Sequence, residues 1–233
     1  MLVQTYNVMY YVVCIQSEHT LSGIRHASLL NKTLDDVQRL SKIQNYFKFM
    51  MVRHPLERLV SAFRNKIEPP VTDFSFRFPN YIKLTILRTY RSKEFEKWVD
   101  SDVKYNLSVT FEEFVYYFVN SDLTKINPHL KPIIHSCHPC QIRYNFYGNF
   151  QTYSQDALMV MKHLQIDEKF YRDKSLHSSS QLTSGYLTKY YNQLDGGLKL
   201  RLYRKLSEEL EFYYTLYPGE RSSHADILGV NGS

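Results

Sequence analysis

The feature that most constrains the fold is a strand, a tight turn and a helix within residues 47–67. The run FKFMMV at residues 47–52 is compact, largely apolar and of strand length. Pro55 follows almost at once, and proline favours the first turn of a helix. Apolar residues then recur at helical spacing, at Leu56, Leu59, Val60, Phe63 and Ile67. A buried strand that passes directly into an amphipathic helix is typical of a parallel α/β sheet.

Similar signals predict the remaining elements. A strand rich in Tyr and Val is expected within residues 6–15, and residues 68–109 are expected to form a long excursion with helix around 81–99. Helices are expected to begin near Thr33, Thr110, Thr152 and Asp195, the last of them ending before Pro218. Few strands, each followed by helix, predict an α/β fold in which a parallel sheet is flanked by helices and carries large helical insertions.

Charge is unevenly distributed along the chain, whose net charge is +6. Between residues 39 and 104, fourteen Lys and Arg stand against seven Asp and Glu. Such a basic segment implies an anionic partner: nucleic acid, phospholipid, nucleotide or acidic polysaccharide. Nucleic acid is disfavoured because no nucleic-acid-binding module is recognisable. A membrane span is not expected, because no apolar run approaches the ~20 residues that a spanning helix needs.

Arg53 and Ser61 are the candidate ligands of a phosphate group. Arg53 ends the predicted strand, and open α/β sheets bind ligands at the carboxyl ends of their strands. Ser61 lies almost two turns into the following helix, with Arg58 and Arg64 nearby. A guanidinium, a hydroxyl and a helix N-terminus together suit a terminal phosphate monoester. The alternative is that Arg53 pairs with Glu57 or with solvent.

Residues 47–66, FKFMMVRHPLERLVSAFRNK, resemble the 3′-phosphate-binding motif of the Golgi carbohydrate sulfotransferases. The similar group contains the chondroitin and dermatan 4-O-sulfotransferases and the HNK-1 sulfotransferase. His54 and Leu56 replace an acid and a Phe of that motif. The resemblance extends over roughly residues 26–217 through FEEFV at 111–115, NPHL at 127–130, CHPC at 137–140 and Lys174-Ser175.

The resemblance implies what the chain binds and does. Arg53 and Ser61 would bind the 3′-phosphate of the sulfuryl donor PAPS (3′-phosphoadenylyl sulfate), with Arg58, Arg64 and Lys174 as weaker candidates. The sulfuryl group would pass to a hydroxyl of a galactose- or GalNAc-containing glycan such as chondroitin or dermatan, an acidic glycosaminoglycan, without a metal. The implied structure is one P-loop-like domain over residues 1–233, incomplete at its N-terminus, on the lumenal side of the Golgi membrane.

His129 is the candidate general base, because it matches a histidine of the family's tetrapeptide and neutral imidazole can accept a hydroxyl proton near pH 7. The alternative is a solvated loop histidine beside Pro128.

The family's loop around the 5′-phosphosulfate has no recognisable counterpart. The corresponding strand is expected at residues 6–13, yet residues 14–23, CIQSEHTLSG, contain no Lys and no Asn-Trp. Charge-assisted contacts to phosphate contribute about 1.5–3 kcal/mol each, so losing several at the reacting end would slow transfer by orders of magnitude. The second function considered is therefore a catalytically inert nucleotide- or glycan-binding protein on the same fold.

The three cysteines, Cys14, Cys137 and Cys140, leave several interpretations open. A Cys-x-x-Cys pair can be half a zinc site, a redox pair or a disulfide. Zinc would need two further ligands, for which His135 and His138 are the nearest candidates. A disulfide between Cys137 and Cys140, or two buried thiols, is favoured, and Cys14 then has no evident partner.

Overall fold

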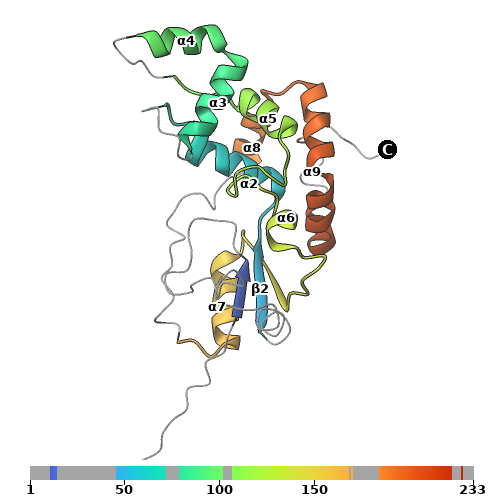
Figure 1. Ribbon diagram of the computed structural model, residues 1–233. Coiled ribbons are helices and arrows are strands. Elements are labelled where there is room, and N and C mark those ends of the chain that lie inside the picture. Colours follow the sequence, from blue (N-terminus) through green and yellow to red (C-terminus); the bar gives the residue numbers. More distant parts are fainter. Residues whose placement is uncertain are drawn as a thin grey trace, which may run out of the picture. The chain divides into compact units, whose positions relative to one another are not determined.

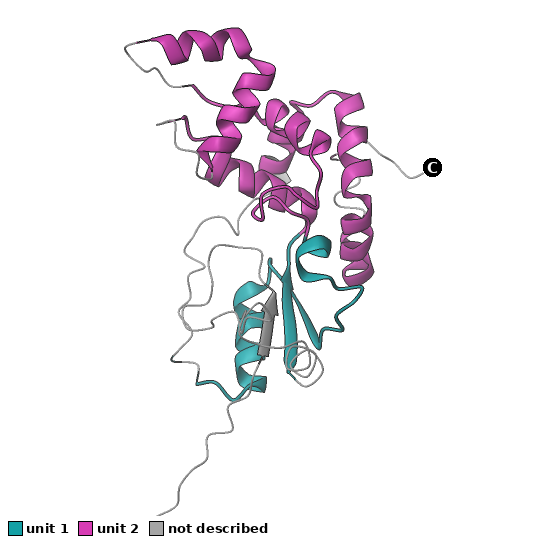
Figure 2. Ribbon diagram, in the orientation of Figure 1, with its two compact units in different colours: residues 1–53, 133–180 teal, residues 54–132, 181–233 magenta. Residues whose placement is uncertain are grey.

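The structure is a computed structural model that describes residues 46–71, 79–101, 107–167, 169, 184–221 and 227, and the backbone of residues 11–14. The chain forms two compact units (Figure 2). Unit 1 comprises Met1–Arg53 and Ile133–Ser180, and unit 2 comprises His54–Pro132 and Gln181–Ser233. Each unit therefore combines two separate stretches of sequence, and each is described by itself. That the whole chain acts as one domain stays a prediction.

Unit 1 contains a three-stranded parallel sheet in the order β1-β2-β3. Its strands are β1 (Tyr11–Cys14), β2 (Phe47–Val52) and β3 (Phe146–Asn149). In the register, Cys14 pairs with Met50, and Val52 pairs with Asn149. Strand β2 is central and buried from Lys48 onward, which explains its nearly continuous apolar sequence. The predictions of a strand at residues 47–52 and of a parallel sheet are confirmed.

The core of unit 1 lies between the sheet and helix α7 (Tyr153–His163), which runs alongside the strands in Figure 1. Phe49 and Met51 of β2 pack there with Val160 and Leu164. Gly148 permits this packing, because a Cβ at that position would lie 2.5 Å from the sulfur of Met51. A short helix, α6 (Ile133–Cys137), leads the chain back into this unit.

Unit 2 is helical. Its elements are α2 (Pro55–Ala62), the π-helical turn η1 (Phe63–Ile67), α3 (Asn80–Tyr90), α4 (Ser92–Asp100), α5 (Phe111–Asn120), α8 (Ser184–Tyr191), α9 (Gly196–Leu216) and the 3-10 turn η4 (Pro218–Glu220). Thr110 and Glu113 form the predicted capping box of α5, and Asp195 caps α9. The amphipathic helix after Pro55 is confirmed, but its last turn is π-helical.

An aromatic cluster forms the centre of unit 2. The Phe63 and Phe111 rings meet edge to face at 5.2 Å, and Tyr190 and Tyr191 of α8 pack edge to face on Phe111. In the excursion, the helix expected around residues 81–99 is formed by two helices, α3 and α4, which meet at Arg91, where the backbone leaves the helical region. The expectation of helix in this stretch is confirmed.

Several sequence-based expectations lie outside the described residues. They are the part of the first strand before residue 11, the helix after Thr33, most of the loop at residues 14–23, and Lys174. Among the helices that are described, none is both long and apolar enough to cross a membrane.

Candidate functional site

Arg53 lies where the sheet of unit 1 places it, directly after the last residue of β2. Its guanidinium carbon is 4.8 Å from the centre of the Phe150 ring, so the cation stacks on an aromatic face. Phe150 directly follows β3, and its N–H donates to the carbonyl of Val52 at 2.8 Å. Parallel pairing of β2 with β3 thus brings both side chains to the carboxyl edge of the sheet.

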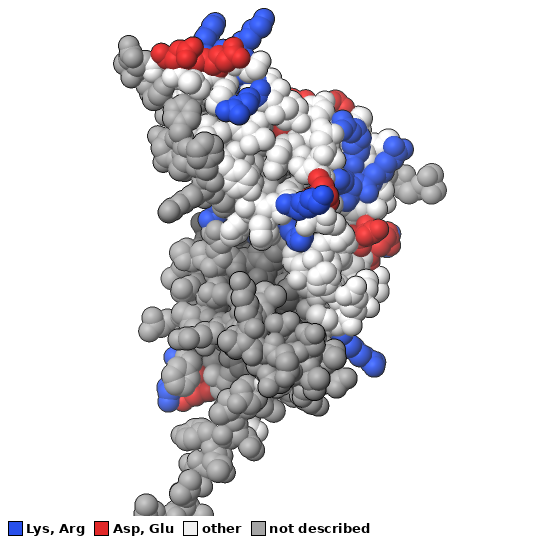
Figure 3. Space-filling model, in the orientation of Figure 1, with Lys and Arg blue, Asp and Glu red and all other residues white. Residues whose placement is uncertain are grey.

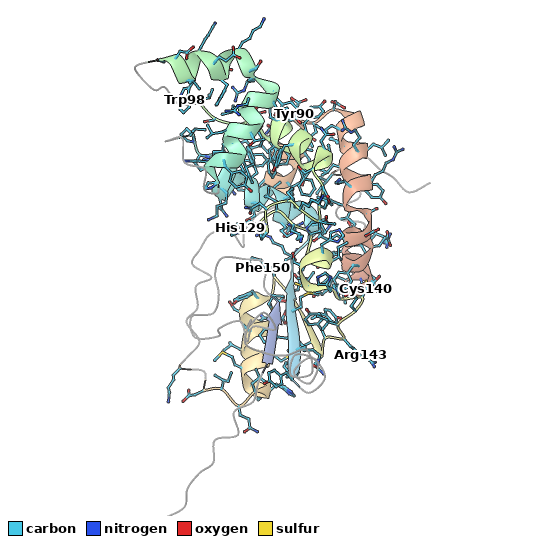
Figure 4. The ribbon with its side chains drawn as sticks, in the orientation of Figure 1. Tyr90, Trp98, His129, Cys140, Arg143 and Phe150 are labelled. Atoms are coloured by element: carbon cyan, nitrogen blue, oxygen red, sulfur yellow. The ribbon has the colours of Figure 1, made fainter. Side chains whose placement is uncertain are left out.

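The loop that carries Phe150 is held to the first turn of α7. The Asp156 carboxylate accepts from the Asn149 N–H at 2.7 Å and from the Thr152 hydroxyl at 2.8 Å. The Asn149 side chain accepts in turn from the Gln151 N–H at 2.9 Å. These bonds hold the backbone on both sides of Phe150, and the aromatic partner of Arg53 is therefore held in place (Figure 4).

Unit 2 begins with His54, the N-cap of α2. Its side chain is buried, and Nδ1 accepts from the Leu56 N–H at 3.3 Å. Nε2 lies 3.1 Å from the Tyr214 hydroxyl. Because Nδ1 accepts, a neutral ring carries its proton on Nε2 and donates to Tyr214. The imidazole therefore caps the helix as an acidic side chain would, which explains how His54 can replace the family's acid.

Ser61 and Arg64 lie three residues apart, where α2 passes into the π-helical turn. The Ser61 hydroxyl accepts from the Asn65 side chain at 3.4 Å. The Arg64 guanidinium lies 4.7 Å from the centre of the Tyr186 ring on α8. The Glu68 N–H donates to the carbonyl of Phe63, five residues back, which defines the π turn. Such turns occur often at functional sites.

Tyr190 links the same end of α2 to α8 through a hydroxyl that donates to the Glu68 carboxylate at 2.7 Å. Burial and the Glu68 carboxylate raise the pKa of Tyr190 to about 12, although the nearby Arg64 guanidinium lowers it. The tyrosine is therefore a neutral donor at physiological pH and adds no negative charge of its own near Arg64.

Arg58 is buried in the packing of unit 2. Its guanidinium pairs with the Glu209 carboxylate on α9 at 2.9 Å and donates to the carbonyls of Leu130 and Lys131 at 3.4 and 3.3 Å. Both terminal nitrogens of the fork thus bond to protein acceptors. This arrangement favours a structural role for Arg58 over phosphate binding.

His129 is partly buried in the loop before α6 (Figure 4). The backbone N–H of His129 donates to the side-chain oxygen of Asn127 at 3.0 Å. The side-chain NH2 of Asn127 donates to the Tyr81 hydroxyl on α3 at 3.1 Å. The loop is thereby anchored to a helix, which holds the backbone of His129 in a defined position. The role of His129 as a base remains a prediction.

The expectation for the Cys-x-x-Cys pair is wrong. Cys137 is disulfide-bonded and Cys140 is a free, exposed thiol, so they neither bond to each other nor form two buried thiols. The chain turns through His138 at φ 48°, which leaves Cys137 buried and Cys140 in solvent. The side chain of Cys14 lies outside the described residues, and so does the partner of Cys137. In the described part of the chain, His, Cys, Asp and Glu form no group of three suited to a metal ion.

Sequence reasoning missed Phe150, Asp156 and Tyr186. Phe150 contacts Arg53 and Tyr186 contacts Arg64, the two cations that the phosphate hypothesis invokes. Asp156 holds the loop that carries Phe150. The signal for Phe150 is local, since an aromatic residue directly after a parallel strand lies at the edge of the sheet that binds ligands. No local signal joins Tyr186 to Arg64, because the two are 122 residues apart in the sequence.

Comparisons with known proteins identify sulfotransferases. The model of the sulfotransferase family matches residues 4–215. Human (Homo sapiens) carbohydrate sulfotransferase 14 is 36% identical over 121 residues, which cover 52% of this chain and 29% of that protein. Mouse (Mus musculus) carbohydrate sulfotransferase 8 is 32% identical over 193 residues, which cover 80% of this chain and 43% of that protein. The matched region thus spans less than half the length of these relatives. No solved structure matches this chain.

Proposed function

The chain belongs to the sulfotransferase family, and we propose that it binds PAPS and transfers the sulfuryl group to a hydroxyl of a galactose- or GalNAc-containing glycan. The observation that carries the proposal is Arg53, held on Phe150 at the carboxyl edge of a parallel sheet. The names of the relatives point to carbohydrate acceptors, and glycans such as chondroitin or dermatan are the proposed substrates. By the same analogy the chain would act in the Golgi lumen.

The donor's 3′-phosphate would be bound by Arg53 and Ser61, with Arg64 adding positive charge. The Arg53 guanidinium carbon lies over the Phe150 ring, and a guanidinium stacked on a ring can still donate to phosphate from the N–H groups at its edge. Both interactions can therefore be made at once. Stacking also restricts the rotamers of the side chain, which lowers the entropy lost when the phosphate binds. On this proposal, the three parallel strands are part of a P-loop-like sheet.

His129 would act on the acceptor. Sulfuryl transfer forms a bond between sulfur and the sugar oxygen, breaks the bond to the nucleotide phosphate, and releases the hydroxyl proton. A neutral imidazole can accept that proton. Negative charge then develops on the departing phosphate, where cationic groups stabilise it. The residues expected around that phosphate, 14–23, lie almost wholly outside the described residues.

Thermal unfolding with adenosine 3′,5′-bisphosphate tests donor binding. Ligand at 100 times its Kd adds about 2.7 kcal/mol to the free energy of unfolding. We expect a clear rise in Tm for the wild type and an affinity about 10- to 100-fold lower for Arg53→Ala, because one charged hydrogen-bonding group is lost. Arg143→Ala, an exposed residue of unit 1 with the same charge change, is the matched control (Figure 4). Absence of any rise in the wild type would overturn donor binding.

Transfer of radiolabelled sulfate from PAPS to desulfated chondroitin separates an enzyme from an inert relative. We expect transfer by the wild type, and a loss of about 10²- to 10⁴-fold in rate for His129→Ala, the contribution typical of a general base. The ligand-induced rise in Tm should remain in that variant. Binding without transfer in the wild type would favour the second function, an inert nucleotide- or glycan-binding protein, which the absence of Lys from residues 14–23 supports.

A further inference from the structure

Four side chains from three helices of unit 2 form one polar and aromatic surface, which we call the Tyr90 surface. It consists of Tyr90 at the end of α3, Tyr116 and Asn120 on α5, and Arg201 on α9. The two tyrosine rings are 6.0 Å apart, and the Asn120 amide lies 3.4 Å from the Tyr90 hydroxyl. Arg201 donates to the Asn120 carbonyl oxygen at 2.7 Å, with its guanidinium carbon 5.9 Å from the Tyr116 ring.

The Tyr90 surface is open to solvent. Tyr90 is 38% exposed, which sets it apart from the buried tyrosines of the same unit. Asn120 and Arg201 are exposed, and Tyr116 is partly buried. Two hydrogen bonds link Tyr90, Asn120 and Arg201, and the Tyr116 ring lies beside Tyr90 and Arg201, so the groups are arranged before any ligand arrives. Such preorganisation lowers the entropy lost on binding.

The helix that carries Arg201 is rich in basic residues. Lys199, Arg201, Arg204 and Lys205 occupy the first half of α9, where Lys and Arg side chains gather in Figure 3. Lys205 donates to the Ser121 carbonyl at 2.8 Å, one residue from Asn120. The described part of the chain offers Arg201 no carboxylate within ion-pair distance, and its hydrogen-bonding partner is the neutral Asn120 side chain. The positive charge of Arg201 is therefore not neutralised within that part of the protein.

These groups match the chemistry of an acidic sugar. Tyrosine rings pack against the C–H face of a pyranose while their hydroxyls stay hydrated. A carboxamide can both donate to and accept from sugar hydroxyls, and a guanidinium binds carboxylate or sulfate through two N–H groups. A stretch of basic residues along one helix suits an extended polyanion.

We propose that the Tyr90 surface binds an acidic glycan chain through its uronate or sulfate groups. The proposal deepens and rests on the proposed function, because such a chain would be the polymeric acceptor. The surface would hold a part of that polymer by residues other than those proposed for the donor and for proton transfer. Contacts at the Tyr90 surface would add binding energy for long acceptors that short acceptors cannot gain. Long acceptors would therefore occupy the transfer site at lower concentrations than short ones.

Binding of glycan oligosaccharides, measured by calorimetry at fixed salt, tests the inference. We expect chondroitin sulfate oligosaccharides to bind the wild type, and Arg201→Ala to weaken binding about tenfold, since a charge-assisted contact is removed. Tyr90→Ala should weaken binding about threefold or more, because a stacking ring is removed. Arg143→Ala is again the matched control and should bind as the wild type does. Affinities for Arg201→Ala and Tyr90→Ala equal to that of the wild type would overturn the proposal.

Two further probes identify the chemistry that is recognised. Hyaluronan oligosaccharides carry carboxylates without sulfate, so their binding would show that uronate suffices, whereas binding of chondroitin sulfate alone would assign recognition to sulfate. Duplex DNA of similar charge should bind more weakly. If DNA bound as tightly and lost as much affinity in Arg201→Ala, the surface would be a general polyanion site and the glycan assignment would be wrong.

The same variants distinguish this inference from the proposed function. Arg201→Ala should keep the full rise in Tm with adenosine 3′,5′-bisphosphate. It should raise the KM for a chondroitin polymer and leave transfer to a disaccharide acceptor unchanged. Nucleotide binding without glycan binding would overturn the Tyr90 surface alone. Glycan binding without nucleotide binding would instead overturn the donor site.

Discussion

At the scale of the residue, two arginines five positions apart show how surroundings decide a role. Arg53 lies at the end of a strand with its guanidinium on the Phe150 ring. Arg58 lies about one turn into α2 and is paired with Glu209 inside unit 2. The sequence made both of them phosphate candidates, because each is a cation near one helix terminus. The carboxylate that engages Arg58 is 151 residues away along the chain, and no local pattern could reveal it.

Phe150 is expected to position Arg53 for donor binding. Phe150→Leu keeps an apolar side chain but removes the ring face, and should weaken binding of adenosine 3′,5′-bisphosphate about two- to fivefold, the worth of an exposed cation–π contact. Phe150→Tyr should restore wild-type affinity. Calorimetric titration of the three proteins measures the difference. A Phe150→Leu variant with unchanged affinity would show that the ring has no influence on the phosphate ligand.

At the scale of the element, β2 and α2 follow from local sequence, whereas the helix break at Arg91 does not. The segment around residue 91 contains neither Gly nor Pro, so no local signal marks the break between the two helices. In the structure the Arg91 side chain bonds to the Ser108 carbonyl and pairs with Glu113 at 2.7 Å. Ser108 lies just before α5, and Glu113 lies in the first turn of that helix. The break between α3 and α4 therefore accompanies contacts with a later element.

The Arg58–Glu209 pair is expected to be essential for packing α2 against α9. Arg58→Met removes the cation that pairs with the buried Glu209 carboxylate and should lower the free energy of unfolding by about 3–5 kcal/mol. Replacing both residues, Arg58→Met with Glu209→Leu, should restore much of that loss because neither charge of the pair remains. Urea unfolding of the two variants and of Arg204→Met, an exposed arginine of α9, tests this. Equal destabilisation by the single and double changes would contradict the prediction.

At the scale of the whole molecule, the two units are interleaved in sequence and share an abundance of tyrosine. The chain leaves unit 1 at Arg53 and returns at Ile133, so neither unit can form from one continuous segment. Both units contain tyrosines whose hydroxyls are withdrawn from water. Burial is the main cause that raises the pKa of Tyr144 in unit 1, and of Tyr190 and Tyr214 in unit 2, to about 12.

Stability is therefore expected to fall in alkali between about pH 10 and pH 12. A tyrosine in the unfolded chain ionises near pH 10, whereas these three in the folded protein ionise only near pH 12. Between the two values the unfolded state binds fewer protons, so the free energy of unfolding decreases as pH rises. Below pH 10 the contribution of these tyrosines is fully present and constant.

Urea unfolding at a series of pH values, followed by circular dichroism, measures this dependence. Tyr144→Phe removes one of the titrating hydroxyls and should reduce the slope above pH 10. It should also lower stability below pH 10, because the hydrogen bond from Tyr144 to the Cys137 carbonyl is lost. A wild-type stability that stays constant up to pH 12 would refute the assignment.

The sequence by itself determined the elements whose signals are local. The apolar run at 47–52, Pro55 and the caps at Thr110 and Asp195 act on neighbouring residues, and the structure forms the strand and helices that they predict. The motif around Arg53 and Ser61 likewise identified the family. These features could be predicted because backbone geometry and side-chain periodicity depend on residues close in sequence.

Only the tertiary structure decided which side chains meet. It placed Phe150 on Arg53, Glu209 on Arg58 and Arg201 beside Tyr116, pairs separated by 97, 151 and 85 positions in the sequence. It also separated Cys137 from Cys140, which local spacing had joined. The physical reason is that packing and charge pairing depend on distance in space. The packing of helices and strands against one another is determined by burial of apolar surface over the whole chain. No single segment determines it.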